Sequence, residues 1–95
     1  MMYPFMVLDD KTEVVHSDAY IDNGVETVKV YFEQPVYGGF HSAECYLPSY
    51  TWKNIDGFSS EEISKYEDFL KSVAQSIRLN SPLSLRGNKN TIKLL

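Results

Sequence analysis

The chain has 95 residues, 43% of them hydrophobic, and a formal net charge of −4, so it can build one modest core and has little room for a deep active-site cleft. Its charge is divided: residues 1–68 carry thirteen carboxylates and four lysines, a net charge of −9, whereas residues 69–95 carry five bases and no acid, a net charge of +5. No apolar run approaches the roughly 20 residues that span a bilayer, and the single cysteine, Cys45, excludes an intramolecular disulfide.

Three strands are predicted in the first third of the chain. Residues 3–8 are apolar and extended-prone, and turn-forming residues at 9–11 separate them from a second strand at 13–16. The strongest turn signal lies at 22–24, because Asn-Gly tolerates the positive φ angles of a type I′ hairpin. Residues 26–34 then alternate between apolar and polar side chains, which is typical of a half-buried strand.

A fourth strand is predicted at 40–47. Pro35 is expected to end the third strand, because proline cannot donate to the ladder, and the glycine pair at 38–39 lets the chain reverse. The inward positions of the fourth strand are Ala43, Cys45 and Leu47, and the outward ones are Ser42, Glu44 and Tyr46. We interpret residues 49–58 as an aromatic connection that packs over one edge of the sheet.

A helix of roughly 20 residues follows. Ser59 and Glu62 form a capping box, in which each side chain accepts the backbone N–H of the other residue. One apolar stripe consists of Ile63, Tyr66, Leu70, Val73 and Ile77, with Ala74 beside it. The opposite, solvated side carries Glu61, Lys65, Asp68, Lys71 and Gln75. Ser81-Pro82 is expected to stop the helix.

These elements predict an α+β fold, a four-stranded antiparallel meander packed on one C-terminal α-helix. Residues 1–82 form a single domain, and residues 83–95 form a basic C-terminal tail. The helix covers one face of the sheet and leaves the other open. That open face is polar and aromatic, with Tyr31 and Tyr46 near each other, a composition that suits either water or a partner.

The candidates for site chemistry are His16, His41 and Cys45. His41 and Cys45 lie four residues apart, about 13 Å along an extended strand, which is too far for both to bind one metal ion. Cys45 sits at an inward position among acidic neighbours, which favours inert core over a thiol nucleophile. No phosphate loop, dinucleotide fingerprint or serine elbow is present. We therefore predict no catalytic residue, cofactor or metal, and any chemical role of these three residues stays open.

Nucleic acid is a disfavoured partner for the sheet. Exposed aromatic residues can stack on single-stranded bases, but phosphate binding needs a positive surface and residues 1–68 are strongly negative. The basic tail at 83–95 is interpreted as a solvated or partly ordered terminus, with weak contact to RNA or DNA as the alternative.

Parts of the sequence resemble a group of short proteins carried by mobile elements and genomes of Firmicutes. The resemblance lies in YPFMVLDD (3–10), TEVVHS (12–17), CYLPSYTW (45–52) and GFS (57–59), and covers most of residues 3–78. It implies no activity and no site residues, because none are assigned for that group.

A weaker resemblance is to HicB-type antitoxins. It is carried by Tyr3-Pro4, Gly39-Phe40, Leu47-Pro48 and the Glu61-Glu62 helix start. Residues 49–58 are longer than the corresponding segment of that pattern, and no ribbon-helix-helix or helix-turn-helix segment follows. These departures from the pattern argue against a DNA-binding, autoregulating antitoxin.

We predict a small, acidic, non-enzymatic protein-binding module from a mobile-element or phage context, an inhibitor or antitoxin-like regulator. A compact negative body can compete with phosphate for a cationic groove on a toxin, nuclease or CRISPR effector. The residues expected to contact the partner are Tyr31, Glu33, Glu44, Tyr46, Tyr50 and Trp52. The first residues lack the basic and apolar regions of a secretion signal, so a cytoplasmic location is expected.

Two other classes of function stay open. A sheet with free edges can pair with a second copy, which would make the chain a homo-oligomerising structural domain, for example a homodimer. A small-ligand-binding protein or an enzyme would need a concave pocket with convergent polar groups.

Overall fold

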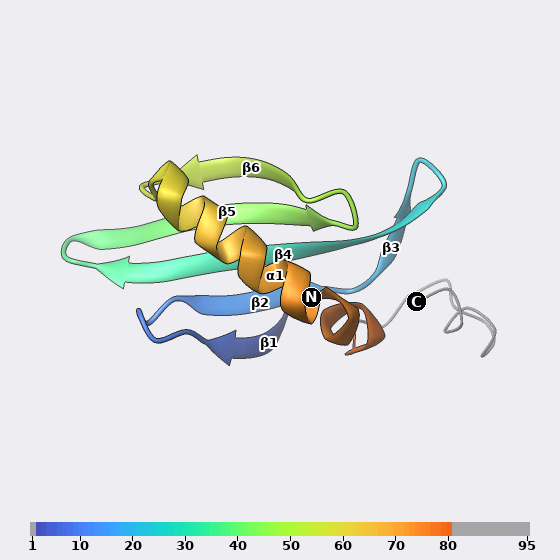
Figure 1. The fold of residues 1–95 in the computed structure, drawn as a ribbon, viewed down its shortest axis with the longest axis horizontal. Helices are drawn as coiled ribbons and strands as arrows, with labels where there is room; N and C mark the ends of the chain where they lie inside the picture. The colour runs from blue at the N-terminus through green and yellow to red at the C-terminus, as the bar shows by residue number, and fades with distance from the viewer. Residues whose placement is uncertain (1, 81–95) are drawn as a thin grey trace.

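The computed structural model describes residues 2–80, which form one antiparallel sheet and one helix (Figure 1). The elements are β1 (Met2–Val7), β2 (Glu13–Ser17), β3 (Tyr20–Asp22), β4 (Val25–Val36), β5 (Gly39–Leu47), β6 (Thr51–Asp56) and α1 (Ser60–Asn80). The strand order is β1-β2-β4-β5-β6, and β3 pairs with β4 outside that path. The α+β class is confirmed, whereas the predicted count of four strands is wrong, since the sheet has six.

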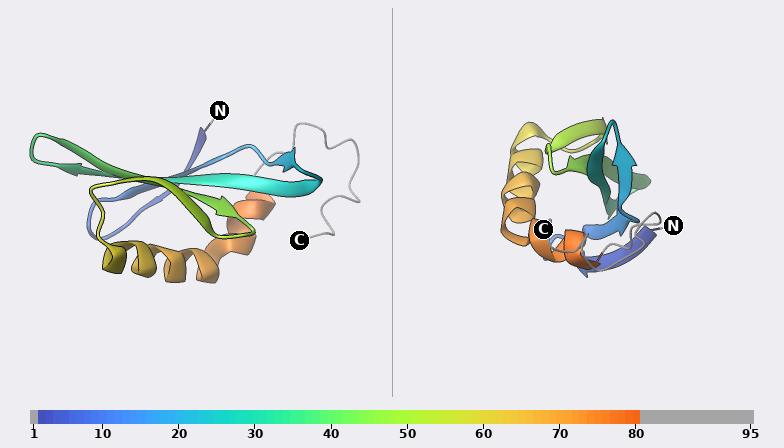
Figure 2. Two further views of the ribbon diagram at one scale, coloured as in Figure 1. Left: turned by 90° about the horizontal axis from the view of Figure 1, so that it is seen from above. Right: turned by 90° about the vertical axis from the view of Figure 1, so that its right-hand side faces the viewer.

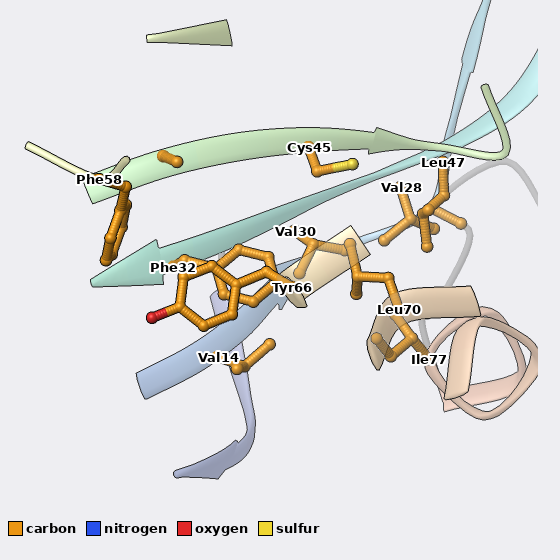
Figure 3. Close-up of a cluster of buried hydrophobic side chains, with 12 residues drawn as sticks. Val14, Val28, Val30, Phe32, Cys45, Leu47, Phe58, Tyr66, Leu70 and Ile77 are labelled. Atoms are coloured by element: carbon orange, nitrogen blue, oxygen red, sulfur yellow. The ribbon is translucent and has the colours of Figure 1, made fainter. Parts of the chain in front are cut away.

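The helix α1 lies along one face of the sheet, and the sheet curls around it (Figure 2). Tyr66, Leu70 and Ile77 of α1 are fully buried, as the predicted apolar stripe requires. The ring of Tyr66 stacks on Phe32 of β4 with 4.9 Å between centroids. Figure 3 shows this core, to which β2, β4, β5 and α1 all contribute. Within residues 2–80, no helix is both long and apolar enough to cross a membrane.

The helix begins as predicted. The backbone N–H of Ser59 donates to Glu62 Oε1 at 2.9 Å, and the N–H of Glu62 donates to Ser59 Oγ at 3.1 Å, which is the capping box. The residues predicted for the solvated side of α1 are all exposed. The predicted tail at 83–95 lies outside the described residues.

The strand β6 corrects the interpretation of residues 49–58 as a connection. It pairs antiparallel with β5, with Trp52 opposite Cys45, after a turn in which Tyr50 has a φ of 59°. β6 is an edge strand, and five of its six residues are exposed. An edge strand with this exposure lacks the regular apolar alternation by which the other strands are predicted.

The Asn23-Gly24 turn is confirmed, with φ angles of 51° and 80° that suit a type I′ hairpin. It joins β3 to β4 by pairing Asp22 with Val25 and Tyr20 with Thr27. Three residues are too few for β3 to give a periodic pattern of its own.

Pro35 does not end the third strand. β4 continues through Pro35 to Val36, which pairs with Gly39 across a two-residue turn. Because hydrogen-bonded and non-hydrogen-bonded pairs alternate in an antiparallel ladder, the next pair, Pro35 with Phe40, needs no N–H from the proline. β2 pairs with β4 only at 30–33, so no ladder bond is lost on the other side either.

Candidate protein-binding surface

The face of the sheet that points away from α1, here called the outer sheet face, carries the polar residues of β4 and β5. Alternation along each strand places Val30 and Cys45 toward α1, and the residues on either side of each in its own strand point outward. The register sets Tyr31 opposite Glu44 and Lys29 opposite Tyr46. The predicted proximity of Tyr31 and Tyr46 is therefore a diagonal neighbourhood across two strands.

Each of these tyrosines is held by a carboxylate of its own strand. The hydroxyl of Tyr31 donates to Glu33 Oε2 at 3.4 Å, and the hydroxyl of Tyr46 donates to Glu44 Oε1 at 3.1 Å. Residues two positions apart in a strand point to the same face, which is why the pairs can form. Both tyrosines are half-buried, so their rings are restrained on an otherwise open surface.

Glu44 is the most connected carboxylate of the outer sheet face. Asn54 Nδ2 donates to its Oε1 at 2.9 Å, and Lys29 Nζ lies 3.6 Å from its Oε2. The hydrogen bond from Asn54, followed by those from Tyr46 and Lys29, lowers the pKa of Glu44 in spite of its partial burial. Glu44 therefore stays ionised at neutral pH as part of a fixed network.

A third tyrosine, Tyr20 of β3, belongs to the same face because it pairs with Thr27. Burial and the charges of Asp22 and Glu44 raise the pKa of its hydroxyl. Burial and the bond to Glu44 raise the pKa of Tyr46, whose ring also lies 5.2 Å from Lys53 Nζ. Sequence reasoning missed Tyr20, although the Asn-Gly turn fixes the register that places it there.

One row of the outer sheet face is acidic without a counter-charge. Glu13 of β2 lies directly opposite Glu33 of β4, and the row continues through Ser42 to Asp56 of β6. Within residues 2–80, none of these three carboxylates forms an ion pair with a base. Like charges directly opposite each other destabilise a sheet, so this row is a feature that folding does not require.

Tyr50 and Trp52 do not share this face with the other four residues predicted to contact a partner. Trp52 points toward α1, where its ring lies 5.5 Å from Phe32 and its Nε1 donates to Glu67 Oε1 at 2.9 Å. Tyr50 is half-buried at the turn before β6, with Lys71 Nζ of α1 5.7 Å from its ring. Glu26, a further strand acid, shares the side of Val28 and so does not face outward either.

The three candidates for site chemistry lie apart in or beside the core. Cys45 is fully buried, and burial together with the charge of Glu67 raises the pKa of its thiol to about 12. His16 is buried beside Tyr3 and Phe5, and His41 packs edge-on against Phe58 at 5.5 Å. Within residues 2–80, no group of three His, Cys, Asp or Glu residues could hold a metal ion.

The described residues line, among others, two surface hollows of about 370 and 400 Å³. The first lies at one end of the outer sheet face, among Tyr46, Thr51 and Lys53, and the second lies between β1 and α1. Neither is lined by His16, His41 or Cys45.

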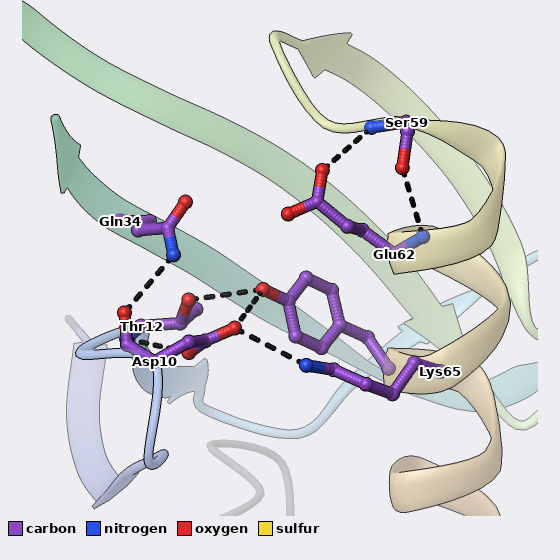
Figure 4. A network of polar contacts seen from close by, with 7 residues as sticks. Asp10, Thr12, Gln34, Ser59, Glu62 and Lys65 are labelled. Carbon is purple, nitrogen blue, oxygen red and sulfur yellow. Dashed lines mark hydrogen bonds and ion pairs between the residues drawn. The ribbon is translucent and has the colours of Figure 1, made fainter.

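A second polar network links the β1–β2 turn to α1 (Figure 4). Tyr66 donates to Asp10 Oδ2 at 2.7 Å, and Lys65 Nζ lies 3.4 Å from the same oxygen. The backbone N–H of Thr12 donates to Asp10 Oδ1 at 3.0 Å. Burial opposes ionisation of Asp10, but the bonds from Tyr66 and Thr12 outweigh it and lower its pKa to about 2. The β1–β2 turn alone therefore does not explain an aspartate at position 10, because its carboxylate also contacts Tyr66 and Lys65 of α1.

Comparisons with protein-family models, with curated proteins and with solved structures give no match. Among the described residues, the outer sheet face combines three half-buried tyrosines with an acidic row that forms no ion pair. These properties define the candidate site.

Proposed function

We propose that the protein is a small, non-enzymatic binding module whose outer sheet face docks on a basic surface of another protein. The observation that carries the proposal is the alignment of Glu13 with Glu33 on an open sheet face. Two carboxylates in this relation destabilise the sheet of the free protein. A partner that brings lysine or arginine side chains to this row would supply the missing counter-charge.

The tyrosines give the same face a means of anchoring. Tyr20, Tyr31 and Tyr46 are large and amphipathic, and such residues are enriched among those that dominate binding energy. The hydroxyls of Tyr31 and Tyr46 are already bonded to Glu33 and Glu44, so less side-chain entropy is lost when a partner covers them.

The acidic body also favours a partner with a cationic groove, such as a toxin, a nuclease or a CRISPR effector. Residues 1–68 carry a net charge of −9, which accelerates encounter with a basic surface at low salt and fades as salt is added. Occupying such a groove would exclude nucleic acid from it. The protein would then act as an inhibitor or antitoxin-like regulator, in line with the weaker resemblance of its sequence to HicB-type antitoxins.

Capture by the tagged full-length chain at low and high salt tests the proposal. Wild type is compared with Glu33→Lys on the outer sheet face and with Asp68→Lys on the exposed side of α1, which makes the same change in net charge. We expect wild type and Asp68→Lys to retain one basic protein that Glu33→Lys does not retain. The amount retained should fall as salt is added. Retention that is equal for all three chains, or absent in all, contradicts the proposal.

A second candidate is self-association through an edge of the sheet, at β1. β1 is an edge strand, and its Met6 and Val7 are exposed. Pro4 and the bulge between Pro4 and Met6 interrupt that edge, which reduces its capacity to pair. Sedimentation velocity over a range of concentrations decides this point, because a monomer at every concentration removes the second candidate.

A further inference from the structure

The β4–β5 hairpin projects beyond the rest of the sheet. β2 pairs with β4 only as far as Glu33, and β6 pairs with β5 only as far as Ser42. Beyond that row, residues 34–41 form three further pairs and a two-residue turn. Figures 1 and 2 show this hairpin arm extending past α1 and the neighbouring strands.

The end of the hairpin arm is apolar and exposed. Tyr37 has a relative exposure of 107% and Phe40 one of 60%, and Pro35 beside Phe40 is also exposed. The turn itself requires only Gly38, whose φ is 85°. Folding therefore does not account for an aromatic residue at position 37 or 40, and exposed apolar groups gathered in one place are typical of interaction sites.

The tip is continuous with the outer sheet face. Strand alternation places Pro35 on the same side as Tyr31 and Glu33, and it places Phe40 on the same side as Ser42 and Glu44. A partner that covers the tyrosines and the acidic row would therefore meet Phe40 and Tyr37 next along the hairpin.

The base of the arm is held in place by contacts of its own side chains with other parts of the fold. Gln34 Nε2 donates to the backbone oxygen of Asp10 at 2.9 Å. His41 packs against Phe58, and Gly57 lies so close that a Cβ there would be 2.1 Å from the ring of His41. An arm that is fixed at its base before binding pays less ordering entropy when it binds.

We propose that the hairpin arm anchors the complex by inserting Tyr37 and Phe40 into an apolar cleft with a basic rim on the partner protein. The rim follows from the carboxylates Glu13, Glu33 and Asp56, which lie in the row at the base of the arm. The same carboxylates oppose approach to an anionic lipid surface. The inference rests on the proposed function, because it names the part of the same surface that supplies the apolar contact.

Photocrosslinking in cells tests the inference. Benzoylphenylalanine replaces Tyr37 at the tip, Tyr31 on the outer sheet face or, as a control, Gln75 on the exposed side of α1. We expect the same protein to be crosslinked from positions 37 and 31 and not from 75. Crosslinking from 31 alone overturns the arm and leaves the proposed function intact. Crosslinking from neither position contradicts both the role of the arm and the proposed function. Crosslinking of position 37 to a second copy of this chain contradicts the role of the arm in binding a partner.

The partner identified by crosslinking is then purified, and its affinity for wild type and for variants of the hairpin tip is measured. Because Tyr37 has no packing within the described part of the fold, Tyr37→Ala should unfold at the wild-type temperature. We expect it to bind at least about tenfold more weakly, with a similar loss for Phe40→Ala. Unchanged affinity of both variants contradicts the inference. So does sedimentation of wild type, but not Tyr37→Ala, with vesicles of phosphatidylcholine and phosphatidylserine, since a lipid surface would then be the occupant.

Discussion

The hydroxyl of Tyr66 on α1 donates a 2.7 Å hydrogen bond to Oδ2 of Asp10, 56 residues earlier in the chain. The ring of the same tyrosine stacks on Phe32, and its oxygen lies 3.0 Å from Thr12 Oγ1. The hydroxyl of Tyr66 thus fixes the β1–β2 turn to the helix, and its ring packs in the core.

Tyr66→Phe should destabilise the fold by about 1–2 kcal/mol. The ring is kept, but the bond to the Asp10 carboxylate is lost and Thr12 Oγ1 loses a buried partner. Urea unfolding followed by circular dichroism measures the change. Tyr37→Phe is the matched control, because the exposed Tyr37 ring should tolerate the same loss within about 0.5 kcal/mol. Equal stability of the two variants would show that the Asp10 bond contributes nothing.

Stability should fall steeply in acid because of Asp10. Its pKa in the fold is about 2, below its ordinary value of 3.8, so the unfolded chain takes up the proton more readily than the folded one. The contribution is complete above 3.8 and is lost as the pH falls toward about 2. Unfolding measured across this range should show a shallower acid loss for Asp10→Asn than for wild type. Asp68→Asn, which changes an exposed carboxylate of α1, should keep the wild-type slope.

Gly57→Ala should destabilise more than Gly24→Ala. Both glycines have positive φ angles, 91° and 80°, so each alanine is strained by about 1–2 kcal/mol. At Gly57 the new Cβ would also lie 2.1 Å from the His41 ring, whereas nothing lies within 4 Å of a Cβ at Gly24. We expect a further loss of about 1–3 kcal/mol at Gly57 from this overlap. Thermal unfolding compares the two, and equal losses would mean that His41 moves aside freely.

The buried thiol of Cys45 should be unreactive in the native protein. The side chain is fully buried and its pKa is raised to about 12, so almost no thiolate is present or accessible at neutral pH. Labelling with iodoacetamide should proceed only as denaturant opens the fold. Complete labelling of the native chain within minutes would instead indicate a reactive thiol and reopen a chemical role for Cys45.

Local signals predicted the helix and most of the strands. The capping box of Ser59 and Glu62 and the apolar stripe of α1 depend on neighbours a few residues away, and both are present. β6 gave no such signal, because an edge strand needs few buried residues. The hydrogen bond between Asp10 and Tyr66 has no sequence signal either. Asp10 is already explained by its turn, and Tyr66 by the apolar stripe of the helix.

The same contrast holds for the candidate site. Strand alternation predicts that Tyr31 and Tyr46 share one face, and the register places them there together with Glu33 and Glu44. Tyr50 and Trp52 follow the cis Leu47-Pro48 bond, where a positive φ at Tyr50 and the pairing of β6 decide which way each side chain points. Composition alone does not distinguish an aromatic residue that packs on a helix from one that faces solvent.

Trp52→Phe should therefore weaken the fold and leave partner capture unchanged. The smaller ring keeps part of the contact with Phe32 but loses the bond from Nε1 to Glu67, for a loss of about 1–3 kcal/mol. Tyr31→Phe is the matched variant on the outer sheet face, where loss of the bond to Glu33 should change stability little and weaken capture. Urea unfolding and capture are measured for both chains at a temperature where each is folded. If Trp52→Phe is as stable as wild type but no longer captures the partner, Trp52 is itself an anchor and the binding surface extends to the helix side.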